Sequence, residues 1–214
     1  MSVAAIIPAY NEEGRIGNVI VAVEQVPEVD SIIVVSDGST DATVAEAASA
    51  GKKVKVVELL TNQGKGAAML AGVHATDADI LLFLDADLVG LRPDHVRDLL
   101  LPVLSGDFDM AMAVFMDGRF ATDLAQKIAP FLSGQRALTR NLLERVPRLQ
   151  VSRFGVEMAL TQFIGEEDIP FARVPWHGIT HVMKEEKLGL AKGFCARIKM
   201  YWEILRSLKL VRGR

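Results

Sequence analysis

Short apolar runs alternate with helical stretches through the first hundred residues, and this alternation most limits the folds open to the chain. The runs lie at residues 3–8, 31–36, 54–59 and 79–84 and are rich in Val, Ile and Leu, which is typical of strands buried on both faces of a parallel sheet. Helical stretches separate them at residues 12–25, 41–50 and 65–75. The pattern predicts an α/β fold with a mostly parallel central sheet flanked by helices.

The second half of the chain has weaker patterns. Residues 93–104 predict a helix and residues 109–115 a strand, followed by a largely helical stretch at 122–145 that Pro130 bends. Residues 154–165 predict a helix, 171–175 and 178–183 short strands, and 185–214 a long basic helix. We therefore expect a single domain over residues 1–214, made of a first half (1–115), a second half (116–184) and a C-terminal basic amphipathic helix (185–214).

Composition narrows the class of protein. The chain has 214 residues, half of them hydrophobic, which suits one domain with a sizeable core. A net charge of -3 argues against general nucleic-acid binding, and the single Cys195 excludes an internal disulfide. The N-terminus lacks a signal-peptide pattern and no apolar run is long enough to span a bilayer. We expect a cytoplasmic protein, with association to a membrane surface left open.

A pair of carboxylates follows the fourth apolar run. Asp85 and Asp87 are two residues apart, so a continuing strand would direct both to one face. Carboxylate pairs suit Mg²⁺, which completes its shell with phosphate oxygens and water. The alternative is a turn with two solvated acids.

Three other polar segments follow apolar runs, and strand ends of a parallel sheet meet at one edge. In residues 8–13, Asn11 is placed to cap the next helix, and Tyr10 is placed to pack on a nucleobase. Asp37 ends the second run, where it can accept a hydrogen bond from a base or ribose hydroxyl. Lys65 lies in a Gly-rich helix entry that offers backbone N–H groups and a cation to an anion.

Taken together and in this order, the four segments resemble those of the family-2 glycosyltransferases, which have the glycosyltransferase A-type fold. They are Ile7-Pro8-Ala9-Tyr10-Asn11-Glu12, Val35-Ser36-Asp37-Gly38-Ser39-Thr40-Asp41, Asn62-Gln63-Gly64-Lys65-Gly66 and Leu84-Asp85-Ala86-Asp87. The resemblance implies that a nucleotide-sugar is bound by Pro8, Ala9, Tyr10, Glu12, Asp37, Lys65, Asp85 and Ala86. It also implies that Asp85 and Asp87 hold Mg²⁺ or Mn²⁺ on the diphosphate.

The second half carries acceptor-side similarity. Ser133-Gly134-Gln135-Arg136, followed by Phe154-Gly155-Val156-Glu157, is similar to segments of polyprenyl-phosphate glycosyltransferases and of glucosyl-3-phosphoglycerate synthases. The synthases also have a Gly-Arg-x-Thr segment, which Gly118-Arg119-Phe120-Ala121-Thr122 matches except for one extra residue. The resemblance implies acceptor binding by Arg119, Gly134 and Arg136, since guanidinium suits phosphate. The alternative for both arginines is an ordinary place on a helix surface.

Two further roles concern catalysis and the metal. We expect Glu157 and Arg136 to be catalytic, with Glu157 as the general base for a hydroxyl acceptor; a phosphate acceptor, already ionised, needs less help. The alternative for Glu157 is a satisfied carboxylate on a helix without a catalytic role. In relatives a His from this region completes the metal shell, and imidazole with two carboxylates suits Mn²⁺. His181 is the first choice and His177 the second, and a His without a metal is the alternative.

The predicted function is that of a metal-dependent hexosyltransferase. The resemblance implies that such an enzyme would move a sugar from a UDP- or GDP-sugar to a phosphorylated or lipid-phosphate acceptor. The alternatives are a retaining enzyme like glucosyl-3-phosphoglycerate synthase and a non-catalytic nucleotide-sugar-binding protein. The apolar stripe of the C-terminal helix predicts packing on the core or on a second subunit in a homodimer, with peripheral membrane contact as the alternative.

Overall fold

The structure is a computed structural model that describes residues 1–116, 134–147 and 155–181. Its strands are β1 (Val3–Ala9), β2 (Ser31–Asp37), β3 (Val54–Leu59), β4 (Ile80–Phe83), β5 (Leu88–Val89), β6 (Met110–Phe115), β7 (Arg136–Thr139), β8 (Ala172–Trp176) and β9 (Thr180–His181). Its helices are α1 (Ile16–Glu24), α2 (Thr43–Ser49), α3 (Lys65–His74), α4 (Pro93–Leu104), α6 (Arg140–Glu144) and α7 (Gly155–Glu166). The chain divides into two units, Met1–Thr180 and His181–Arg214.

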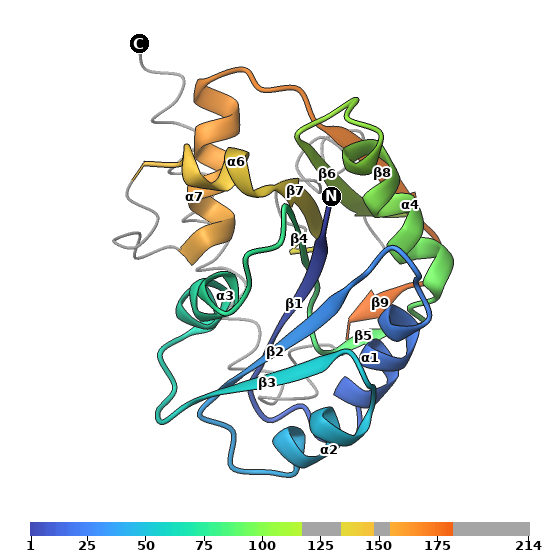
Figure 1. The fold of residues 1–214 in the computed structure, drawn as a ribbon, viewed down its shortest axis with the longest axis vertical. Helices are drawn as coiled ribbons and strands as arrows, with labels where there is room; N and C mark the ends of the chain where they lie inside the picture. Colours follow the sequence, from blue (N-terminus) through green and yellow to red (C-terminus); the bar gives the residue numbers. More distant parts are fainter. Residues whose placement is uncertain (117–133, 148–154, 182–214) are drawn as a thin grey trace, which may run out of the picture. The chain divides into compact units, whose positions relative to one another are not determined.

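The first unit is built on a sheet that has seven strands in the described part of the chain, in the order β3-β2-β1-β4-β7-β6-β8. Figure 1 shows β1, β2 and β3 running side by side. The pairings are parallel except that β7 is antiparallel to both of its neighbours, β4 and β6. The predicted mostly parallel sheet is therefore confirmed. A second sheet pairs the short strands β5 and β9.

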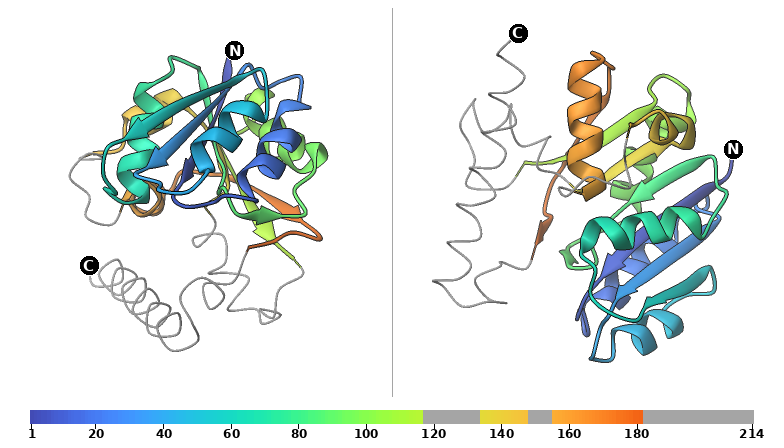
Figure 2. Two further views of the ribbon diagram at one scale, coloured as in Figure 1. Left: turned by 90° about the horizontal axis from the view of Figure 1, so that it is seen from below. Right: turned by 90° about the vertical axis from the view of Figure 1, so that its left-hand side faces the viewer.

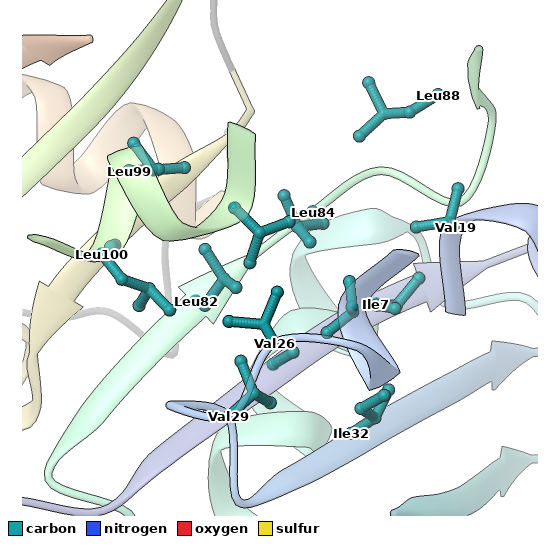
Figure 3. Packing of buried hydrophobic residues seen from close by; sticks show 14 of the residues in the cluster. Ile7, Val19, Val26, Val29, Ile32, Leu82, Leu84, Leu88, Leu99 and Leu100 are labelled. Atoms are coloured by element: carbon teal, nitrogen blue, oxygen red, sulfur yellow. The ribbon is translucent and has the colours of Figure 1, made fainter. Parts of the chain in front are cut away.

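Helices cover both faces of the sheet because alternate strand residues point to opposite sides. Ile7 of β1 belongs to an apolar cluster with residues of α1 and α4, whereas its neighbour Ile6 belongs to a second cluster with residues of α3, α6 and α7. Figures 1 and 2 show these two groups of helices on opposite sides of the sheet. Figure 3 shows residues of the first cluster, among them Ile7 of β1, Leu82 of β4 and Leu99 of α4.

Two predictions of local structure are wrong. Residues 136–139, expected within a helix, form β7, because Ala137 and Leu138 fill the sheet between β4 and β6 and are fully buried. Helix α1 begins at Ile16, later than expected. The expected C-terminal helix lies outside the described residues, and so does the first half of the stretch 122–145, residues 122–133. Among the residues that are described, no helix has the length and apolar character needed to cross a membrane.

Candidate active site

The loops that follow β1 and β2 are joined by direct hydrogen bonds. Asn11 has a positive φ of 54°; its N–H donates to Ser39 Oγ at 3.2 Å, and its Oδ1 accepts from the N–H of Thr40 at 2.9 Å. Asn11 therefore does not cap α1, whose N-cap is Arg15, and the capping prediction is wrong. The residue ties the first two loops together instead.

The loop before α3 is held by the carboxylate of Asp37. Asp37 is buried and accepts from the N–H groups of Gln63, at 2.7 Å, and Gly64, at 2.8 Å. Gly38 lies against this loop with φ +70°, and a Cβ there would come within 2.6 Å of the Asn62 nitrogen. The third loop can approach this closely only because residue 38 is glycine. Three of the four predicted segments thus meet at one edge of the sheet.

Lys65, the first residue of α3, connects the two halves of the chain. Its Nζ lies 2.5 Å from Asp85 Oδ1, after β4, and 2.8 Å from Glu157 Oε1, in the first turn of α7. Partial desolvation acts to lower the pKa of Lys65, but the attraction of the two carboxylates outweighs it and raises that pKa overall. The ammonium therefore stays charged at neutral pH. A carboxylate from the first half of the chain and a carboxylate from the second half therefore share one cation.

Residues 134–136 enter the site because β7 pairs with β4, with Phe83 opposite Arg136. Arg136 is 1% exposed, and its Nη1 donates to the backbone oxygen of Glu157 at 3.1 Å. Burial lowers the pKa of the guanidinium, while Glu157 and Asp85 oppose that shift, and an arginine keeps its charge in such surroundings. Gly134 lies beside the ion pairs of Lys65. A Cβ on Gly134 would lie 2.6 Å from Glu157 Oε1 and 2.9 Å from Lys65 Nζ.

The predicted metal-binding pair lies between β4 and β5. Strand β4 ends at Phe83, so Asp85 and Asp87 lie in a connecting loop and turn, and strand alternation does not orient them. Asp85 Oδ1 faces the ammonium of Lys65, which shows that positive charge is stabilised at this oxygen. Carboxylate oxygens there have the chemistry that Mg²⁺ and Mn²⁺ prefer.

A third metal ligand is not identified. Within residues 1–116, 134–147 and 155–181, no three His, Cys, Asp or Glu side chains form a group that could hold a metal ion. His181 belongs to β9, and its side chain lies outside the described part of the chain. His177 is exposed in the connection between β8 and β9. The role of either histidine stays a prediction.

The remaining predicted residues have different surroundings. Tyr10 is 48% exposed at the end of β1, whereas Ala9 and Ala86 are buried. Glu12 is buried and pairs with Arg15 at 3.1 Å. Pro8 is partly buried in β1, and Arg119 lies outside the described residues.

Sequence reasoning missed one residue of the site, Gln135. Its side-chain amide makes two hydrogen bonds to Asp85, one to the backbone N–H and one to Oδ2, each 2.9 Å long. The only signal in the sequence was its place between Gly134 and Arg136. A single glutamine between these two residues does not by itself indicate a functional role.

Comparison with known proteins shows to which family the chain belongs. The profile of the family described as Glycosyl transferase family 2 matches residues 4–160, which is most of the chain. The chain belongs to this family. The glucosyl-3-phosphoglycerate synthase of Mycolicibacterium smegmatis is 36% identical over 113 residues, covering 50% of this chain and 37% of the relative. The dolichyl-phosphate beta-glucosyltransferase of Drosophila melanogaster is 38% identical over 109 residues, covering 44% and 33%. The chain spans about a third of the length of these two curated relatives.

Solved structures show the same fold. The glucosyl-3-phosphoglycerate synthase of Mycobacterium tuberculosis in complex with Mn²⁺, UDP and glucosyl-3-phosphoglycerate has a TM-score of 0.72 and 29% identity, covering 85% of this chain and 72% of that one. The same synthase with Mg²⁺ and UDP has a TM-score of 0.70 and 29% identity, covering 85% and 71%. These similarities confirm the predicted glycosyltransferase A-type fold.

Proposed function

We propose that this family-2 glycosyltransferase moves a hexose from a UDP-sugar to a phosphorylated acceptor with the help of Mn²⁺ or Mg²⁺. The observation that carries the proposal is the ion-pair group in which Lys65 contacts both Asp85 and Glu157. Asp85 belongs to the segment expected to hold the donor diphosphate, and Glu157 belongs to the helix expected to meet the acceptor. This group supports the proposal because it joins the two segments that the donor and the acceptor would approach.

The nucleoside end of the donor would lie on the three joined loops. Tyr10 exposes a ring at the end of β1, and aromatic faces suit a nucleobase. The hydrogen bonds of Asn11 and Asp37 hold the loops in place before any ligand arrives, which lowers the entropic cost of binding. Similarity to the UDP-bound synthases supports uridine as the base; a GDP-sugar is the alternative that the sequence left open.

The chemistry requires that the charge of the departing diphosphate be balanced. A divalent cation held by Asp85 and Asp87 would supply that compensation when bound. Lys65 adds a permanent positive charge beside Asp85. Glu157 Oε1 contacts the same ammonium, and its carboxylate is placed to take a proton from a hydroxyl acceptor. With a phosphate as the nucleophile, Glu157 would orient the acceptor instead.

Arg136 would act on the acceptor side through helix α7. Its guanidinium is buried and donates to the backbone of Glu157, so we propose that it holds the first turn of α7 against the sheet. Direct contact of Arg119 or Arg136 with an acceptor phosphate stays a prediction. The same is true of the cytoplasmic location, the homodimer and the membrane contact of residues 185–214.

The first test is a transfer assay with UDP-glucose and Mn²⁺, using 3-phosphoglycerate in one arm and a polyprenyl phosphate in the other. Product in one arm identifies the acceptor class, and NMR of the product anomer separates inverting from retaining chemistry. Binding of UDP without transfer in either arm would favour the non-catalytic nucleotide-sugar binder.

Asp87→Ala should reduce transfer by roughly 100-fold or more, because charge compensation by a metal contributes several kcal/mol to the transition state. The circular dichroism spectrum should stay unchanged, since Asp87 lies in a turn outside the sheet. Asp107→Ala is the matched control, because Asp107 is an exposed carboxylate in the connection before β6. It lies at the amino ends of β4 and β6, away from the carboxyl end of β4 that Asp87 follows. Full activity of Asp87→Ala in the presence of a chelator would contradict the proposal.

A further inference from the structure

The side chain of Gln135 is fully buried, and both ends of its amide are engaged with a single residue. Gln135 Oε1 accepts from the Asp85 backbone N–H at 2.9 Å, while Gln135 Nε2 donates to Asp85 Oδ2 at 2.9 Å. The first bond needs an acceptor and the second a donor, so only one orientation of the amide satisfies both. A glutamine fits this pair of partners, whereas a carboxylate or an apolar side chain does not.

We infer that Gln135 is a positioning residue that orients the Asp85 carboxylate for a divalent cation. The inference rests on the proposed function, because it concerns the metal of that same site. The two hydrogen bonds fix the Asp85 side chain relative to its own backbone and engage Oδ2 with an amide. The other oxygen, Oδ1, is then turned toward the ammonium of Lys65, where positive charge is stabilised.

The sheet holds Gln135 firmly enough for such a role. Its backbone oxygen accepts from the Ala113 N–H of β6 at 3.0 Å, and the next residue, Arg136, pairs with Phe83 at the end of β4. The amide thus reaches Asp85 from a paired part of the backbone, while Asp85 itself lies in a loop. Hydrogen bonds to a ligating carboxylate orient it for the metal, and their loss usually weakens metal binding or activity by about 10- to 100-fold.

A different result is expected if the role of Gln135 is purely structural. If Gln135 only satisfies buried polar groups, its replacement lowers stability and leaves metal affinity unchanged in the protein that remains folded. The deciding quantity is therefore the gain in UDP affinity that Mn²⁺ provides. It is measured by calorimetry as the ratio of the Kd for UDP in a chelator to the Kd at a fixed Mn²⁺ concentration that only half-saturates the wild-type protein, where weaker metal binding lowers the ratio.

The variant is Gln135→Met, which keeps the length of the side chain and removes both hydrogen-bonding groups. We expect the Kd for UDP in the chelator to stay within about twofold of the wild type, since the nucleoside loops are separate from Gln135. The gain provided by Mn²⁺ should fall by about 10-fold or more. Gln162→Met is the matched control, because Gln162 also donates its amide to a carboxylate, that of Glu166, at an exposed place on α7; it should keep the wild-type gain.

Each outcome bears on the inference. A wild-type gain in folded Gln135→Met would overturn it and leave the proposed function intact. Absence of any Mn²⁺-dependent gain in the wild-type protein would overturn both. If circular dichroism shows that Gln135→Met is unfolded, Gln135→Asn decides by the same criterion. That variant keeps an amide but is one methylene too short to reach both partners, so a wild-type gain there would also overturn the inference.

Discussion

At the scale of single residues, the site depends on the absence of a side chain at Gly134. The backbone φ of this glycine does not lie in the left-handed region, so an alanine could adopt its conformation. The space is what excludes a larger residue: a Cβ would lie 2.6 Å from Glu157 Oε1 and 2.9 Å from Lys65 Nζ. Glycine at this position lets a lysine and two carboxylates meet.

Gly134→Ala should therefore impair the reaction more than the fold. The added methyl group would push apart the Lys65 and Glu157 side chains, whose ends can move. We expect kcat/KM to fall by about tenfold or more, as misplacement in a site commonly causes, with a change in unfolding free energy below about 1 kcal/mol. Kinetics and urea denaturation measure the two quantities. Unchanged kinetics would show that the ion-pair group is not part of the reaction centre.

At the scale of elements, helix α3 places Lys65 by packing closely on the sheet. Gly72 lies on the buried side of this helix, and a Cβ there would come within 2.4 Å of Ile6 Cγ2 and 3.2 Å of Val35 Cγ2. These methyl groups belong to β1 and β2 and are buried in the core. The helix can approach the strands this closely because residue 72 has no side chain.

Gly72→Ala should lower the unfolding free energy by about 1–3 kcal/mol, because overpacking of a dense core outweighs the better helix propensity of alanine. Gly165→Ala in α7 is the control, since its Cβ would meet no atom within 4 Å; it should raise stability by up to about 1 kcal/mol. Urea denaturation measures both. A more stable Gly72→Ala protein would mean that α3 can move away from the sheet without cost.

At the scale of the whole molecule, ligand binding should be visible as stability. Three loops that are far apart in the chain are joined by Asn11 and Asp37, and residues from both halves meet at Lys65. A donor bound across these segments would bind the folded chain and not the unfolded one. Binding energy at the site therefore adds to the stability of the whole unit.

UDP with Mn²⁺ should raise the melting temperature of the wild-type protein. At about a hundred times its Kd, a ligand of the native state adds about 2.7 kcal/mol, which corresponds to roughly 5–10 °C for a chain of this length. A chelator should remove most of the shift. A thermal-shift series with UDP, GDP and their sugars measures it, and a shift with GDP alone would correct the choice of donor base.

The parallel sheet, and the places of the polar segments that follow its strands, could be predicted from the sequence alone. Buried parallel strands are continuous apolar runs, and the polar residues that follow them must lie at the carboxyl edge, so Asp37, Lys65 and Asp85 could be placed from local patterns. The role of Asn11 could not be predicted in this way. A polar residue that follows a strand can either cap the next helix or form hydrogen bonds to a neighbouring loop.

Tertiary contacts were needed to assign residues 136–139 to a strand and to place Gln135 beside Asp85. Their partners are β4 and β6, at least 20 residues away in the chain, and a short run such as Ala137-Leu138 is compatible with either helix or strand. Pairing with both neighbouring strands buries these residues and resolves the ambiguity. Long-range pairing of this kind brings residues 134–136 to the carboxylate of Asp85.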